Sequence, residues 1–148
     1  MKKILFAASE AVPFMKTGGL ADVTGSLPKY FDKKNYDVRV ILPKYVCMEE
    51  RWKGQLHFLC HFYVNLSWRK QYVGIFETTY DGITYYLVDN EFYFAGNAPY
   101  NNIYEDVEKF AFFSKAVLEA LPYLDFCPDI IHCHDWQTGL LPVFLRTL

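Results

Sequence analysis

The chain begins with a short apolar run of the kind found in strands that are buried on both faces. Residues 3–8 read Lys-Ile-Leu-Phe-Ala-Ala, without the polar residues that alternate with apolar ones in a half-exposed strand. Such strands belong to parallel sheets, which are covered on both faces. A second strand is expected at 37–43, and a helix opened by Gly18 and Gly19 lies between the two. The first 43 residues therefore predict a right-handed β-α-β unit.

The helix expected after the two glycines has an apolar residue at almost every third or fourth position. This spacing gives one apolar stripe along the helix, as in helices that pack on a core. The stripe consists of Leu20, Val23, Leu27, Tyr30 and Phe31. Pro28 has no backbone N–H to donate, so a bend is expected near it.

The middle of the chain has a different pattern. Three segments rich in Phe, Tyr and Val, at 55–66, 71–79 and 83–88, are typical of strands. The dipeptide Asp81-Gly82 separates the last two and is a strong hairpin signal. We therefore expect an antiparallel meander inserted into the parallel sheet or attached to it.

The last third of the chain predicts a return to alternating helix and strand. After an asparagine-rich loop, a helix is expected at 103–121, with Asn101 or Asn102 as its N-cap. A buried strand at 130–133 and a helix from Leu140 onward follow. The predicted fold class is α/β, a Rossmann-like, doubly wound and mostly parallel sheet with an antiparallel β-meander insertion.

The composition restricts the class of protein further. With 148 residues, 52% of them hydrophobic and 22% charged, the chain is long enough for one domain with a core and is not disordered. A net charge of −2 predicts no nucleic-acid partner, and no apolar run reaches the roughly 18 residues of a membrane span.

Four cysteines without a CxxC pair are typical of free thiols, so we expect a cytoplasmic location. Aromatic residues make up 19% of the chain, which fits either a large aromatic core or rings that face a sugar.

Two polar clusters follow the first and the last of the predicted parallel strands. Residues 16–22 read Lys-Thr-Gly-Gly-Leu-Ala-Asp, and residues 134–137 read His-Asp-Trp-Gln. Ligands of open α/β sheets bind at the carboxyl ends of the strands, so we expect both clusters on one rim of the sheet. Gly18 and Gly19 could let backbone N–H groups reach a phosphate, with Lys16 adding a positive charge. The alternative is an ordinary glycine-rich helix start with a solvated lysine.

The second cluster also has two interpretations. Asp135 and Trp136 could hold a sugar, because a carboxylate accepts hydrogen bonds from hydroxyl groups and an indole stacks on the ring. Alternatively, Trp136 belongs to the core and Asp135 caps the last helix. His132 and His134 share one face of a strand and, with Asp135, could approach a metal site. Nothing else in the chain completes such a ligand set, so we expect no metal.

Residues 16–22 stand close behind the first strand and Ser9-Glu10, and they resemble the KTGGLADV signature of bacterial glycogen synthases and plant starch synthases. Four further segments resemble the same family in the same order, at 12–14 (Val-Pro-Phe), 25–28 (Gly-Ser-Leu-Pro), 40–43 (Val-Ile-Leu-Pro) and 132–140 (His-Cys-His-Asp-Trp-Gln-Thr-Gly-Leu). The resemblance therefore covers nearly the whole chain.

The resemblance implies the N-terminal, Rossmann-like half of a GT-B glycosyltransferase. Such enzymes transfer glucose from ADP-glucose to the non-reducing 4-hydroxyl of an α-1,4-glucan such as glycogen, with retention of configuration and without a metal or cofactor. The implied partners are ADP-glucose, the glucan and the protein's own C-terminal nucleotide-binding domain. Residues 1–148 would then be a truncated N-terminal domain, and this fragment alone is expected to be inactive.

The resemblance also implies roles for individual residues. The expected donor-site residues are Lys16, Gly18, Gly19 and Asp22. The expected residues at the reacting sugars are Asp135 and Tyr100, with His134, Trp136 and Gln137 completing the substrate site. Many relatives have a histidine where this chain has Gln137, and an amide does not titrate, so no acid–base role is expected there.

Two other functions are open at this point. The chain could be a stand-alone α-glucan-binding α/β module that uses Tyr100, Trp136 and the aromatic meander. It could also be a flavodoxin-like, nucleotide-binding regulator of an unrelated family. A pure glucan binder has no need of a phosphate-facing glycine pair with a lysine, and a flavodoxin-like regulator has no need of the His-Asp-Trp loop.

Overall fold

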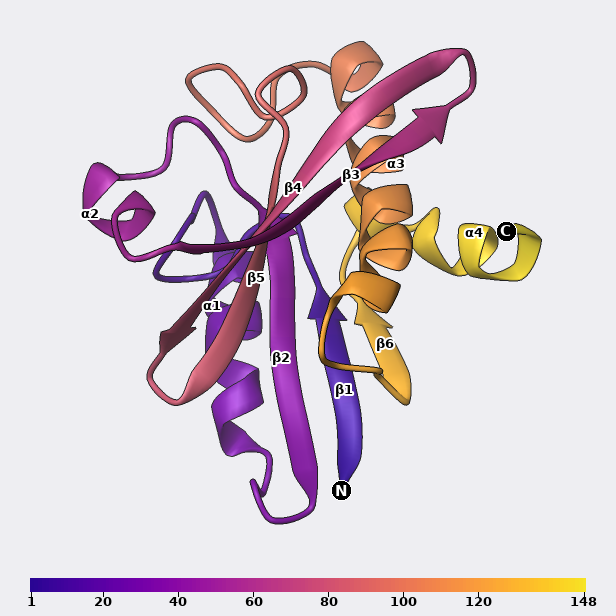
Figure 1. Cartoon of the computed structure of the whole chain (residues 1–148). Helices are drawn as coiled ribbons and strands as arrows, with labels where there is room; N and C mark the ends of the chain where they lie inside the picture. The colour runs from indigo at the N-terminus through magenta and orange to yellow at the C-terminus, as the bar shows by residue number, and fades with distance from the viewer.

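Six strands form one mixed sheet in the computed structural model, which describes residues 1–148 (Figure 1). Their order across the sheet is β3-β4-β5-β2-β1-β6. The strands are β1 (Lys2–Ala7), β2 (Tyr36–Pro43), β3 (His57–Leu66), β4 (Arg69–Tyr80), β5 (Ile83–Asp89) and β6 (Ile130–Cys133). The helices are α1 (Gly19–Ser26), α2 (Glu50–Lys53), α3 (Ile103–Ala120) and α4 (Leu141–Thr147), with 3-10 turns η1 (Leu27–Tyr30), η2 (Leu121–Tyr123) and η3 (Trp136–Thr138).

The sheet has a parallel half and an antiparallel half. β1 runs parallel to both β2 and β6, and β5 runs parallel to β2. β3, β4 and β5 form an antiparallel meander that extends the same sheet. At the turn between β4 and β5, Asp81 and Gly82 both have positive φ angles of 51° and 78°, as a type I′ hairpin turn requires. The predicted parallel sheet with an attached meander is confirmed.

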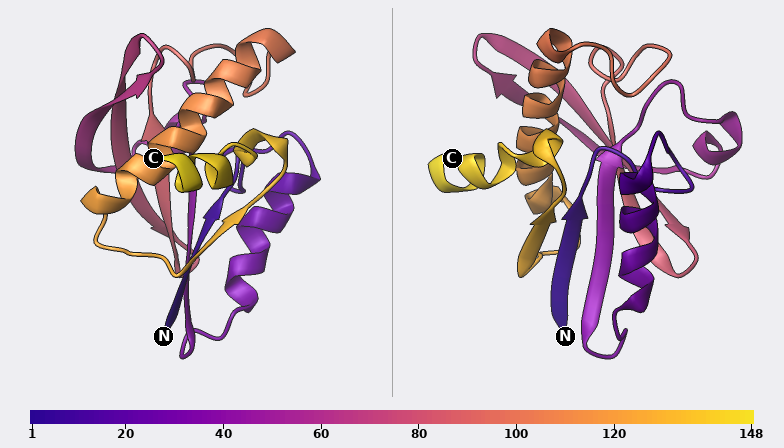
Figure 2. Two further views of the ribbon diagram at one scale, coloured as in Figure 1. Left: turned by 90° about the vertical axis from the view of Figure 1, so that its right-hand side faces the viewer. Right: turned by 180° about the vertical axis from the view of Figure 1, so that it is seen from behind.

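β1 and β2 are buried on both faces, as the apolar run predicted. Leu5 and Ile41 belong to a core cluster of 21 residues that includes the buried face of α3. Phe6 and Val40 belong to a cluster of 11 residues on the opposite face. Figure 2 shows α3 and α1 on opposite sides of the sheet. The sheet is therefore a middle layer, and the carboxyl ends of its parallel strands form a rim.

Helix α1 does not bury the predicted apolar stripe. Two residues of that stripe, Val23 and Tyr30, are 49% and 84% exposed. The helix instead buries three small residues, Ala21, Thr24 and Gly25. A Cβ on Gly25 would overlap Val12 Cγ2 and lie 2.6 Å from the Val12 carbonyl oxygen, so the helix approaches the chain too closely for larger side chains. Near Pro28, where a bend was expected, the regular α-helix stops and the 3-10 turn η1 begins.

Helix α3 begins where the sequence predicted. The Asn102 side chain accepts a hydrogen bond from the Glu105 backbone N–H at 3.1 Å, which makes Asn102 the N-cap. The helix buries Phe110, Phe113 and Val117 against the larger core cluster. None of the helices is both long and apolar enough to cross a membrane.

Candidate active site

Tyr100 lies between the loop after β1 and the loop after β6, at the rim of the sheet where these two strands end. The loop after β1 contributes Ser9, whose hydroxyl shares a hydrogen bond of 2.6 Å with the Tyr100 hydroxyl. The ring centroids of Tyr100 and Phe110, a residue of α3, are 5.9 Å apart. The rings of Phe110 and Trp136 form a T-shaped pair with their centroids 5.7 Å apart. The His134 backbone N–H donates to the carbonyl of Ala7, so the end of β6 is held against the end of β1.

Glu10 shapes the loop that carries the first cluster. Its side chain is buried, and one carboxylate oxygen accepts hydrogen bonds from the Thr17 backbone N–H (2.9 Å) and the Thr17 hydroxyl (2.6 Å). The Thr24 hydroxyl donates to the Glu10 carbonyl at 2.6 Å, which fixes α1 to the same loop. Sequence reasoning did not include Glu10 among the site residues. Its position directly after a buried strand could have indicated it, because a carboxylate that is buried there needs hydrogen-bond donors to offset its desolvation.

Gly18 and Gly19 leave the N-terminus of α1 open. Gly18 precedes the helix in an extended conformation, and no side chain caps the helix there. A Cβ on either glycine would meet no atom within 4 Å, so the space above the first turn is free. The first N–H groups of a helix have no partner within it and carry partial positive charge. An anion could reach them here without a steric obstacle.

Lys16 lies beside this open helix start and pairs with Asp22. The lysine Nζ is 2.8 Å from Asp22 Oδ2 and 3.0 Å from Oδ1, and both side chains are about half exposed, at 53% and 54%. An exposed pair of this kind contributes only about 0–1 kcal/mol to stability. The lysine can therefore exchange its partner for an anionic ligand at little cost. Its place in the donor site stays a prediction.

Asp135 occupies a strained backbone conformation at the end of β6. Its φ of 65° with ψ of −179° falls in a region that is populated almost only by glycine, at a cost of about 1–3 kcal/mol for other residues. Its Oδ1 accepts a hydrogen bond from the Trp136 backbone N–H at 2.8 Å. The carboxylate thus caps η3, not the last helix as the alternative interpretation had it. Asp135 is exposed, so its other lone pairs are accessible to a ligand.

His134 is held in the neutral form. Burial, and to a lesser extent the charge of the neighbouring His132, whose ring centroid is 4.4 Å away, lower its pKa to about 4. The predicted shared face of the two histidines is confirmed by this contact. Both rings also pack on Phe6. No group of three or more His, Cys, Asp or Glu side chains in residues 1–148 is arranged to hold a metal ion.

Trp136 and Gln137 differ in exposure although they are neighbours. Trp136 is 49% exposed, so a large part of its indole is free to contact a ligand. Gln137 is only 7% exposed, and its Oε1 is buried without a hydrogen-bond partner. Of the nine site residues that the sequence predicted, Gln137 alone lies in the interior. Its role in substrate binding stays a prediction.

The Tyr100 hydroxyl remains protonated at physiological pH. Burial raises its pKa to about 12, and the negative charges of Glu10 and Asp135 act in the same direction. The hydroxyl can therefore donate or accept a hydrogen bond but cannot act as a base. Because β1 and β6 are parallel neighbours, the two predicted clusters follow strand ends on one rim, as expected. The roles of the individual residues in substrate binding stay predictions.

A comparison with known protein families agrees with this geometry. The family described as the starch synthase catalytic domain matches residues 3–148. The chain belongs to the starch synthase catalytic domain family. This membership excludes the alternative of a flavodoxin-like regulator from an unrelated family.

Individual members of the family extend well beyond the present chain. It is 70% identical over 146 residues to a glycogen synthase of Lachnoclostridium phytofermentans and 64% identical to one of Lachnospira eligens. Both alignments cover 99% of this chain, which spans about 30% of the length of those relatives. The solved catalytic domain of starch synthase IV from Arabidopsis thaliana, bound to ADP and acarbose, superimposes with a TM-score of 0.80 at 29% identity. That match covers 99% of this chain and 30% of the plant chain, and it confirms the predicted GT-B type of fold.

Proposed function

We propose that this chain forms the N-terminal side of the active-site cleft of a glycogen synthase. The reaction is transfer of glucose from ADP-glucose to the non-reducing end of an α-1,4-glucan, with retention of configuration. The observation that carries the proposal is the open N-terminus of α1, with Lys16 beside it, on the same rim as Tyr100 and Asp135. Family membership and the ADP and acarbose bound to the plant relative support it.

In this proposal, the diphosphate of ADP-glucose binds at the start of α1. The N–H groups at Gly18 and Gly19 donate to phosphate oxygens, and Lys16 leaves Asp22 to pair with the anion. Negative charge grows on the diphosphate as its bond to glucose breaks. Fixed N–H groups and an ammonium ion stabilise that charge more than they stabilise the bound donor, which is how such groups accelerate a reaction.

The sugars bind nearer to β6. Asp135 accepts hydrogen bonds from glucose hydroxyl groups, and the exposed part of Trp136 gives a flat apolar surface for a pyranose ring. Tyr100 contributes a neutral hydroxyl between the two clusters. The backbone strain at Asp135 supports this role, because strained residues gather where function requires a particular geometry.

The second side of the cleft is proposed to come from the C-terminal nucleotide-binding domain, which recognises the adenine base. This chain supplies donors only from one rim, which is half of the enclosure that excludes water from a transfer reaction. We also propose that transfer needs no metal and no cofactor, since Lys16 and the α1 amides supply the positive charge. The four free thiols fit the proposed cytoplasmic location.

Substitution of Lys16 in the full-length enzyme tests this proposal. Lys16→Ala removes a charge-assisted contact worth about 2 kcal/mol, so kcat/KM for ADP-glucose should fall about 30-fold. The matched control is Lys29→Ala, because Lys29 also forms an ion pair with an aspartate, Asp81, at 2.8 Å but belongs to η1. Equal kinetics for the two variants would contradict the proposed diphosphate site.

A further inference from the structure

A buried ion pair stands behind the segment that carries Tyr100. Lys109 and Asp106 lie on α3, with Nζ 3.3 Å from Oδ1 and side-chain exposures of 4% and 7%. In every other ion pair of the chain, both side chains are more than one-tenth exposed. A pair so fully removed from water must make further hydrogen bonds to offset the loss of its hydration.

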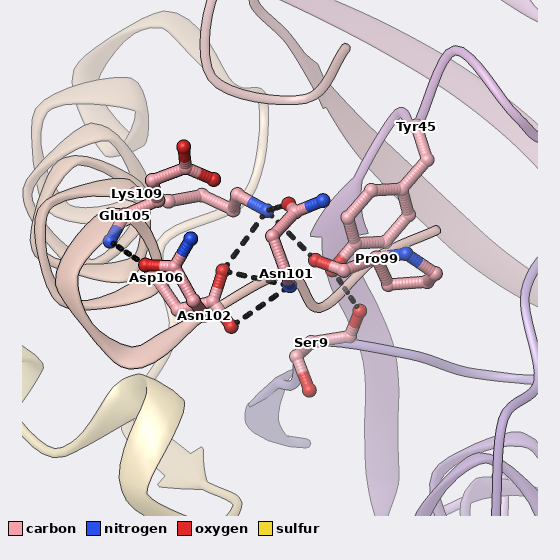
Figure 3. Close-up of polar contacts among 8 residues, drawn as sticks. All are labelled: Ser9, Tyr45, Pro99, Asn101, Asn102, Glu105, Asp106 and Lys109. Carbon is pink, nitrogen blue, oxygen red and sulfur yellow. Dashed lines mark hydrogen bonds and ion pairs between the residues drawn. The ribbon is translucent and has the colours of Figure 1, made fainter. Parts of the chain in front are cut away.

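Those further hydrogen bonds all go to the residues on either side of Tyr100. Lys109 Nζ donates to the Pro99 carbonyl at 2.8 Å and to Asn101 Oδ1 at 2.7 Å, and Asp106 supplies the opposite charge. Both oxygens of Asp106 accept from the Asn101 backbone N–H, each at 3.1 Å. Figure 3 shows these contacts converging on one short stretch of chain, with Ser9 and Tyr45 beside it.

Tyr100 is therefore fixed at two ends. Its backbone lies between two residues that the ion pair holds, and its hydroxyl bonds to Ser9 Oγ. Ser9 is itself fixed, because its carbonyl accepts a hydrogen bond of 2.6 Å from the buried Tyr45 hydroxyl. The position of the Tyr100 hydroxyl on the rim depends on both anchors.

Stability alone does not explain this ion pair. The desolvation of two buried charges often equals or exceeds their attraction, and well-packed apolar residues of similar size can replace such pairs without loss of stability. An apolar pair, however, has no group that could hold the Pro99 carbonyl or the Asn101 amide. The specific contribution of Lys109 and Asp106 is the conformation of residues 99–101.

The segment has space to move if these contacts are lost. A cavity of about 570 Å³ lies beside it, lined in part by Gly96, Asn101, Tyr104 and Lys109. Gly96 has a φ of 106°, so the loop already turns sharply at one margin of this cavity. Without the ion pair, the Asn101 N–H loses its acceptors, and the segment is tied to α3 only through the cap at Asn102.

We propose that Lys109, Asp106 and Asn101 form a positioning cluster that fixes Tyr100 for glucosyl transfer. This inference rests on the proposed function of Tyr100 at the reacting sugars. The cluster touches no substrate and acts only through the tyrosine. A displacement of about 1 Å in a group that orients the reactants can cost about 100-fold in rate, so the effect on turnover should be large.

The test is the double variant Lys109→Met/Asp106→Leu in the full-length enzyme, which removes both charges together. We expect kcat to fall by about 10- to 100-fold, KM for ADP-glucose to change by less than about 3-fold, and the melting temperature to change little. The matched control is Arg69→Met/Glu108→Gln, which removes an ion pair of 2.8 Å between β4 and the same helix and leaves residues 99–102 unchanged. Parent kinetics in the first double variant, or an equal loss in the control, would overturn the proposal.

A Tyr100→Ala background shows whether the cluster acts through the tyrosine. If it does, adding the double variant to Tyr100→Ala should lower kcat by less than about 3-fold further, because coupled residues are not additive. A further loss as large as in the parent enzyme would overturn the positioning role.

Hydrogen exchange separates this inference from the function proposed for Tyr100. If Tyr100→Ala keeps full activity, the tyrosine takes no part in the reaction, and the function proposed for Tyr100 is contradicted. Backbone amides of residues 97–103 should exchange at least about 10-fold faster in Lys109→Met/Asp106→Leu and at the parent rate in the control. Unchanged protection would show that the cluster does not hold the segment and would overturn the inference by itself.

Discussion

Asp135 is the rim residue at which stability and activity should separate most clearly. Its carboxylate caps η3 through the Trp136 N–H, and its backbone adopts a conformation that suits glycine. These two contributions to the free energy of unfolding oppose each other. Three substitutions in the full-length enzyme, to Asn, Ala and Gly, change them in different combinations.

The magnitudes follow from the local geometry. Asp135→Asn keeps the cap, so stability should hardly change. Asp135→Ala loses the cap, which costs about 1 kcal/mol, and keeps the strain. Asp135→Gly loses only a few tenths of a kcal/mol from the cap and relieves about 1–3 kcal/mol of backbone strain. Against this gain, the larger entropy of glycine in the unfolded chain costs about 0.5–1 kcal/mol. Asp135→Gly should therefore be about 0.7–3 kcal/mol more stable than Asp135→Ala.

Activity should follow a different order. All three variants lack the charge that is proposed to accept glucose hydroxyl groups, and a charged hydrogen bond is worth about 1.5–3 kcal/mol, so each should lose about 10- to 100-fold in kcat/KM. The assays are steady-state kinetics with ADP-glucose and glycogen and thermal melting of each variant. Full activity of Asp135→Asn would refute the sugar contact. A glycine variant less stable than the alanine variant would refute the strain.

Three further predictions concern other residues. The pKa of His134 is lowered to about 4, so between pH 6.5 and 4 the unfolded chain binds more protons than the folded one. The melting temperature should therefore fall as the pH is lowered from 6.5 to 4, and it should fall less in His134→Gln. Gly18→Val should raise KM for ADP-glucose because its side chain obstructs the α1 amides, and the melting temperature should stay near that of the parent because no atom lies within 4 Å of a Cβ there. A normal KM would show that these amides do not bind ADP-glucose. Gly25→Ala should cost about 1–3 kcal/mol, seen as a lower melting temperature, because its Cβ meets the Val12 carbonyl oxygen at 2.6 Å; an unchanged melting temperature would contradict the close packing of α1.

Local patterns in the sequence predicted most of the fold. The apolar run at 3–8, the Asp81-Gly82 turn and the Asn102 cap each depend on neighbouring residues only, and each was confirmed. The apolar stripe of α1 was wrong because periodicity does not show which face of a helix meets the sheet. Here Gly25 brings the helix so close to Val12 that its small face is buried.

The candidate site was predictable to the extent that its residues follow strands. Lys16, Gly18 and Asp135 lie at the rim because parallel strands end there. The strain at Asp135 could not be predicted, since a φ of 65° is a property of the folded loop. The i,i+3 spacing of Asp106 and Lys109 is also that of an ordinary surface ion pair, so it does not reveal that Lys109 is buried. The hydrogen bonds of Lys109 to the Pro99 carbonyl and Asn101 Oδ1 depend on the folded loop.

Transfer of radiolabelled glucose from ADP-glucose to glycogen tests the central claim most directly. The full-length protein should incorporate label into the glucan, and residues 1–148 alone, although folded, should incorporate none, because half a cleft cannot enclose the departing diphosphate. Incorporation should persist after treatment with a metal chelator. Absence of transfer by the full-length protein, or turnover by residues 1–148 alone, would contradict the account.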